Sequence, residues 1–190
     1  MRQLILTITT LTLVTTALAA PPTLSPELSR SARQKIERIE NGRTTPGEAI
    51  VLTEAEINSL LEYEYKPEMP AGVREPTVRI EQDHATIHAF VDIGKMQQVA
   101  GGSWGGLWAL LFSGERELNA QCGPRALDGR AAIQVESVEF GGATLPGTLV
   151  DWLISATVSD AESGSGNPVA LPDNIRSVRL EPEQAVVVMN

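Results

Sequence analysis

The sequence predicts an α+β domain in which a curved antiparallel sheet of about six to eight strands wraps around about two to four helices. Hydrophobic residues alternate along several short segments joined by polar turns, which is typical of sequential hairpins. Capping residues and apolar spacings of three and four mark a few helices between them. The single cysteine, Cys122, excludes an internal disulfide, so we expect the fold to depend on its hydrophobic core.

Residues 1–20 predict a secretory signal peptide. Arg2 gives a basic start, Leu4–Leu18 is apolar and uncharged, and small residues follow at Ala19 and Ala20. We expect cleavage after one of these two alanines and an exported protein, either periplasmic or secreted. The apolar span is shorter than the ~20 residues that a membrane-crossing helix needs, so no stable transmembrane anchor is expected after cleavage.

Residues 21–190 are predicted to form a single α+β domain, with an N-terminal surface helix in 21–44 and a core domain in 45–190. The formal net charge is −9, and loss of Arg2 makes the mature chain one unit more acidic. An acidic chain without a basic block argues against nucleic-acid binding and against electrostatic docking on anionic lipid headgroups.

The first helix is expected to begin after Ser25, which acts as N-cap ahead of Pro26, and to end at Asn41-Gly42. A short apolar run, Ala49–Leu52, predicts a strand after it.

The second helix is expected to begin after Thr53, because Thr53 and Glu56 have the spacing of a capping box. It should end near Tyr63–Lys66, ahead of Pro67. Its apolar stripe is formed by Ile57, Leu60 and Leu61.

The rest of the chain predicts hairpins, a third helix opening at Leu145–Gly147, and no internal repeat. Apolar alternation changes phase within Arg130–Phe140, and a bulge near Ser137 would restore it and bend the strand. The expected strand pairs are Thr77–Ile80 with Ala85–Ile93, Glu115–Cys122 with Arg130–Phe140, and Ile175–Leu180 with Ala185–Met189.

One long segment, Gln97–Gly114, has no charged residue. A helix that is apolar on every side is either enclosed in a core or in contact with lipid, and the sequence leaves both interpretations open. Tryptophan favours membrane–water boundaries, but the expected helix, about ten residues long, is too short to span a bilayer. Its large side chains share one helical face: Trp104, Leu107, Trp108, Leu111 and Phe112.

No catalytic centre is visible, and neither a metal nor a cofactor is expected. Gly101–Gly105 matches the Gly-x-Ser-x-Gly pattern, but no convincing strand precedes it and no histidine follows His88. His84 and His88 lie on an alternating segment, about 13 Å apart if extended, which is too far to share a metal. Cys122 alternates onto an apolar face, so we expect a buried structural thiol.

Three segments carry a family resemblance: Leu52–Leu61, Val138–Pro146 and Leu171–Ile175. Through them the chain, over about residues 45–190, resembles the LmeA-like and YpmS-like exported bacterial proteins, which are related to the tubular lipid-binding (TULIP-like) fold. The resemblance implies a long, curled antiparallel sheet around one or two helices, with an apolar groove for acyl chains.

The sequence therefore predicts a non-catalytic exported binding protein for lipid or another long apolar ligand in the cell envelope. The alternative is a structural or interaction protein of the envelope, whose exposed edge strands or first helix, Pro26–Glu40, dock a partner protein. The residues expected to line the ligand site are Ile57, Leu60, Leu61, Trp104, Leu107, Trp108, Leu111 and Phe112.

Overall fold

The chain folds as two α-helices and nine strands, and every strand pair is antiparallel within the part that the structure describes. The α+β class predicted from the sequence is therefore confirmed. The strand arrangement differs from the prediction, because the strands divide into a three-stranded and a six-stranded sheet. The computed structural model describes residues 23–69, 71–92, 94–95, 114–127, 129–148, 150–151 and 168–190.

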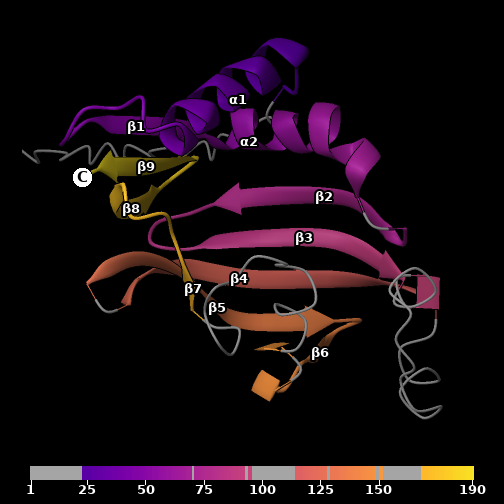
Figure 1. The fold of residues 1–190 in the computed structure, drawn as a ribbon. Helices are drawn as coiled ribbons and strands as arrows, with labels where there is room; N and C mark the ends of the chain where they lie inside the picture. Colours follow the sequence, from indigo (N-terminus) through magenta and orange to yellow (C-terminus); the bar gives the residue numbers. More distant parts are fainter. Residues whose placement is uncertain are drawn as a thin grey trace, which may run out of the picture.

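The two helices lie side by side along one margin of the molecule (Figure 1). The first, α1, spans Pro26–Glu40 and begins where the Ser25 side chain accepts a hydrogen bond from the Leu28 amide. The second, α2, spans Glu54–Leu60 and begins with a complete capping box. It continues as a π-helical turn, Leu61–Tyr65, and then as a 3₁₀ turn that contains Pro67. Both predicted helix starts are confirmed.

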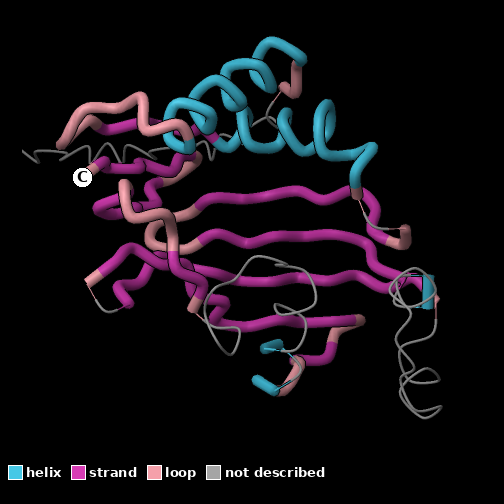
Figure 2. Tube along the Cα trace, viewed as in Figure 1, coloured by secondary structure: helices cyan, strands magenta, loops and turns pink. Residues whose placement is uncertain are grey.

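The six-stranded sheet forms one broad layer beside the helices (Figure 2). Strands β4 and β5 pair as far as Leu127 opposite Arg130, so most of the connection expected in Gly123–Gly129 is part of the sheet. The strands of this sheet are β2 (Val73–Ile80), β3 (Ala85–Asp92), β4 (Glu115–Leu127), β5 (Arg130–Phe140), β6 (Ala143–Thr144) and β7 (Val169–Ala170).

The bulge expected near Ser137 is present. Gln121 of β4 lies opposite Ser137, whereas the next residue, Cys122, lies opposite Val135, so Glu136 is the extra residue. This insertion puts Val135 and Val138 in the same hydrophobic cluster although they are three positions apart, an odd spacing that would otherwise place them on opposite faces.

The three-stranded sheet joins the two ends of the described chain. Strand β1 (Ala49–Thr53) pairs with β9 (Gln184–Met189), and β9 pairs in turn with β8 (Ile175–Glu181). This sheet packs on Ile39 of α1 through a cluster in which Met189 is fully buried. The closing hairpin predicted from the sequence is confirmed.

Contrary to the expectation of no internal repeat, two hairpin tips share a short repeat. Val78–Ala85, at the tip of β2 and β3, is matched one hundred residues later by Val178–Ala185, at the tip of β8 and β9. The equivalent residues pack against one another. The pairs Ile80 and Leu180, and Ala85 and Ala185, form one buried cluster, with Val78 and Val178 packed against it.

Side chains of α2 cover the free edge of β2. The Asn58 side chain accepts a hydrogen bond from the Val78 N–H and donates one to the Val78 carbonyl, both at 2.7 Å. The Glu54 carboxylate accepts from the Ile80 N–H at 2.7 Å. Pro76 contributes no N–H to the same strand. The covered edge of β2 is not available to β1 or β8, which is why the strands form two sheets.

We expect Asn58→Ala to lower the free energy of unfolding by about 2–3 kcal/mol, because it removes both partners of the half-buried Val78 peptide group. Urea unfolding measures the change. The matched control is Asn119→Ala, which removes an exposed 3.3 Å hydrogen bond to Glu117 and should cost less than about 0.5 kcal/mol. Equal losses in the two variants would show that Asn58 does not seal the edge.

Candidate functional site

The candidate site is the apolar face of the six-stranded sheet. One cross-strand row runs over four strands, because Val78 lies opposite Ile87, Ile87 opposite Ala120, and Ala120 opposite Val138. Val138 is 2 % exposed, whereas Ile87 is 38 % exposed. An isoleucine in the middle of an apolar row is normally covered, so this exposure marks an open position among the residues that the structure describes.

Both ends of this face are covered. At the hairpin end, Leu180 and Ala185 pack on Ile80 and Ala85. At the other end, Leu145 packs against the clusters that contain Ala89, Val91 and Phe140, and with Val150 against Val138. The exposed position at Ile87 therefore lies between two covered parts of the same apolar face.

The opposite face of the same sheet is polar. Thr86 and His88 alternate with Ile87 on β3, and their cross-strand partners on β4 are Gln121 and Asn119. The His88 ring lies 3.1 Å from the Glu117 carboxylate. The contrast between the two faces shows that the exposure of Ile87 is not part of a generally solvated surface.

The structure separates the three site residues of α2 and its extension. Leu60 is 4 % exposed and packs with Ala32 and Leu52 beneath α1. Ile57 is half-buried and contacts both this cluster and the cluster of the hairpin tips. Leu61, also half-buried, opens the π-helical turn. The other residues predicted to line the site lie outside the described residues: Trp104, Leu107, Trp108, Leu111 and Phe112.

Alternation along Ala85–Ile93 puts Ile87 on the apolar face of its strand, but nothing in the sequence singles it out as a site residue. Alternation identifies the face of a sheet on which a side chain lies. It carries no information about whether a second layer covers that side chain. Ile87 therefore could not be distinguished from Ala89 or Val91 without the three-dimensional structure.

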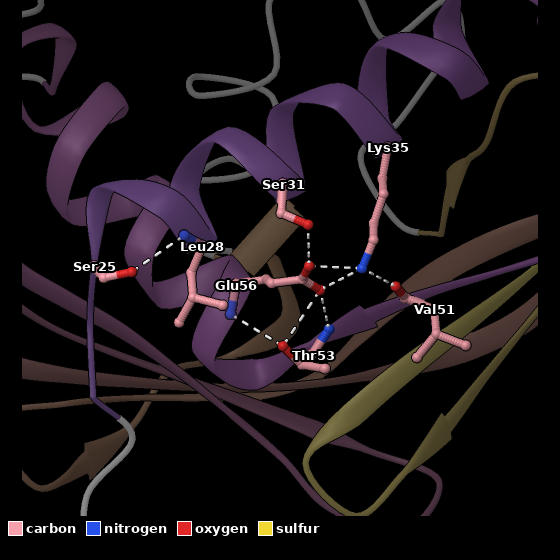
Figure 3. A network of polar contacts seen from close by, with 7 residues as sticks. All are labelled: Ser25, Leu28, Ser31, Lys35, Val51, Thr53 and Glu56. Carbon is pink, nitrogen blue, oxygen red and sulfur yellow. Dashed lines mark hydrogen bonds and ion pairs between the residues drawn. The ribbon is translucent and has the colours of Figure 1, made fainter.

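A nearly buried carboxylate connects α1, β1 and α2 (Figure 3). Glu56 is 5 % exposed, and Lys35 donates to its two carboxylate oxygens at 2.6 and 2.7 Å and to the Val51 carbonyl at 2.8 Å. The Ser31 hydroxyl donates to the same carboxylate at 2.6 Å, and the Thr53 N–H at 2.9 Å. Each polar group of this network has partners, as a buried network requires.

The charges around α1 explain two pKa shifts. Burial alone would raise the pKa of the Glu56 carboxyl, but hydrogen bonds from Lys35, Ser31 and the Thr53 N–H outweigh it and leave the pKa lowered. Hydrogen bonds from Arg33 at 2.6 Å and Ser29 at 2.8 Å lower the pKa of Glu64. Both carboxylates are ionised and accept hydrogen bonds from side chains of α1. They hold α1 on the rest of the domain, which is a structural role.

The two histidines have carboxylate neighbours, and the single cysteine is half-buried. His84 lies 2.7 Å from Glu81, whereas His88 faces Glu117, so the two histidines serve different carboxylates. Cys122 is half-buried rather than fully buried, and burial, followed by the charge of Glu136, raises the pKa of its thiol. In the part of the chain that the structure describes, no group of three or more His, Cys, Asp and Glu side chains is placed to hold a metal ion.

Comparison with known proteins gives no relative. No protein-family model matches the chain, and neither the curated proteins nor the solved structures contain a match. Among the described residues, no helix has the length and apolar character needed to cross a membrane. The class of this protein is therefore defined by its own fold and surface. It is an α+β domain whose apolar sheet face is exposed at Ile87.

We expect acid to weaken the Glu56 network. The folded-state pKa of Glu56 is lowered, so its stabilising effect is complete above the ordinary carboxyl pKa of about 4.3 and is lost as pH falls through the folded value. Glu56→Gln should lower the free energy of unfolding at pH 7 by about 2–4 kcal/mol and flatten its decline below about pH 5.

The control for this change is Glu62→Gln, which removes an exposed ion pair with Lys66 and should cost less than about 1 kcal/mol. Urea unfolding from about pH 3 to about pH 7 measures both variants. A Glu56→Gln profile parallel to the wild-type profile would contradict the assigned role.

Proposed function

We propose that this chain is a non-catalytic exported binding protein for lipid or another long apolar ligand in the cell envelope. The observation that carries the proposal is Ile87, which is 38 % exposed in the centre of an apolar row. An exposed apolar side chain between covered neighbours on the same face is a position that an apolar ligand can cover.

The mechanism is burial of methylene groups on the open sheet face. The open part of the row is Ile87 with its half-buried neighbours Val78 and Ala120, since Val138 is already covered. Each buried methylene contributes about 0.8 kcal/mol, so an acyl chain that covers these residues gains free energy without any covalent step.

The finer features of the proposal come from the sequence. They are a sheet curled around one or two helices, membership of the LmeA-like and YpmS-like group of the TULIP-like fold, and export by the segment 1–20. The ligand site then includes the aromatic segment Trp104–Phe112 together with Ile57. Because the chain is acidic, with a net charge of −9, a zwitterionic or neutral lipid suits it better than an anionic one.

We expect the purified wild-type protein to retain lipid after incubation with phosphatidylcholine vesicles. Ile87→Glu should retain at least about tenfold less, because a carboxylate on the apolar face must be desolvated when an acyl chain covers it. Native mass spectrometry followed by organic extraction measures the bound lipid.

The matched control is Thr86→Glu, which places the same charge on the polar face of the same strand. Equal retention by Ile87→Glu and Thr86→Glu would exclude this face as the site. A wild-type protein that stays free of lipid would exclude the proposed function and favour a structural or interaction protein of the envelope.

A further inference from the structure

The two ends of α1 are attached to the domain by different forces. Near its C-terminal end, Ile39 is 7 % exposed and packs into the cluster that contains Ile50 and Met189. The Asn174 side chain donates to the Ile39 carbonyl at 2.6 Å. This end is therefore fixed in the core of the three-stranded sheet.

The N-terminal part of α1, up to Lys35, is held mainly by polar contacts. Arg33 pairs with Glu64 at 2.6 Å and also lies over the Tyr65 ring, 5.2 Å from its centroid. Lys35 pairs with Glu56 at 2.6 Å. Serines supply further hydrogen bonds. The Ser29 hydroxyl donates to Glu64, the Ser31 hydroxyl donates to Glu56, and the Ser25 N–H donates to the Ser59 hydroxyl.

Few apolar side chains of α1 contribute to this contact. Ala32 is fully buried and Ile36 packs beside it. Beneath them lie Leu52 and Leu60, which form an apolar surface under this part of α1. Ile57 lies next to them and also belongs to the apolar contacts of the hairpin tips, so the covered surface continues into the core beneath the six-stranded sheet.

We propose that α1 is a charge-latched cover that opens from its N-terminal end, pivots at Ile39 and uncovers the apolar strip Leu52, Ile57 and Leu60. The latch consists of the pairs Arg33–Glu64 and Lys35–Glu56 with their serine partners. Opening is a property of the chain itself and does not depend on whether the chain binds lipid.

The physical reason is the difference between polar and apolar docking. When the cover opens, its ionic groups regain water, which repays part of the free energy of the lost contacts. Buried methyl groups have no such compensation. Arg33 and Glu64 retain 33 % and 28 % exposure of their side chains, so salt weakens this pair, whereas Ile39 keeps its contacts.

Acid acts in the same direction as salt. Glu56 is faced by Lys35 and Ser31 of α1 and by Thr53 of β1, and Glu64 is faced by Arg33 and Ser29. Protonation removes the negative charge that these donors hold, and the lowered pKa of each carboxyl shows that the closed state favours the ionised form.

Hydrogen exchange on the full chain tests the cover. At constant pH, Lys35→Ala should reduce protection of amides 28–35 by at least about tenfold, because it leaves Glu56 buried without its cation. Amides of β4 and β9 should keep their protection. The matched control is Arg30→Ala, which breaks an exposed ion pair with Glu27 inside α1 itself.

Wild-type protein provides a second measurement if Lys35→Ala does not fold. Raising NaCl from about 0.05 M to about 0.5 M should increase exchange in 28–35 while β9 stays unchanged. The proposal is overturned if α1 and β9 lose protection together, or if residues 28–35 stay as protected as β9 in the variant and in salt.

Discussion

The contact between two hairpin tips is the constraint on which the rest of the structure depends. The Asp83 N–H donates to the Leu180 carbonyl at 3.1 Å, and the equivalent Glu183 N–H donates to the Ile80 carbonyl at 2.9 Å. These reciprocal bonds join the six-stranded sheet to the three-stranded sheet. The Glu54 N–H donates to the Glu183 carbonyl at 2.7 Å, so the start of α2 is fixed at the same point. The positions of both sheets and of α2 follow from this junction.

The repeated sequence is explained by this reciprocal contact. Asp83 and Glu183 adopt left-handed conformations, with φ of 66° and 64°, which are costly for residues other than glycine. In each tip that conformation occurs at the residue whose N–H reaches across to the other hairpin. Each tip contributes an alanine and a large aliphatic residue, Ile80 in one and Leu180 in the other, to the shared cluster. The segments Val78–Ala85 and Val178–Ala185 make equivalent contacts and therefore have nearly the same residues.

Local signals predicted much of the fold. Ser25, Thr53 and the phase change before Val138 act over a few residues, so both helix starts and the bulge could be predicted from the sequence. The division into two sheets could not, because it depends on Asn58 and Glu54 bonding to strand residues twenty or more positions away. The open position at Ile87 is equally non-local, since it depends on where the covered parts of the same face end. The role of Trp104–Phe112 remains a prediction.

The domain uses two kinds of contact for two kinds of attachment. The sheets are joined by buried aliphatic side chains and backbone hydrogen bonds, and parting them would expose Ile80 and Leu180 with no compensation from solvation. The N-terminal part of α1 is joined by side chains that water solvates well. Ile57 contacts both regions and so connects the cluster beneath α1 to the hairpin junction. The rigid contacts between the hairpin tips therefore lie beside the separable contact of α1. That separable contact covers the apolar strip Leu52, Ile57 and Leu60, which continues into the core.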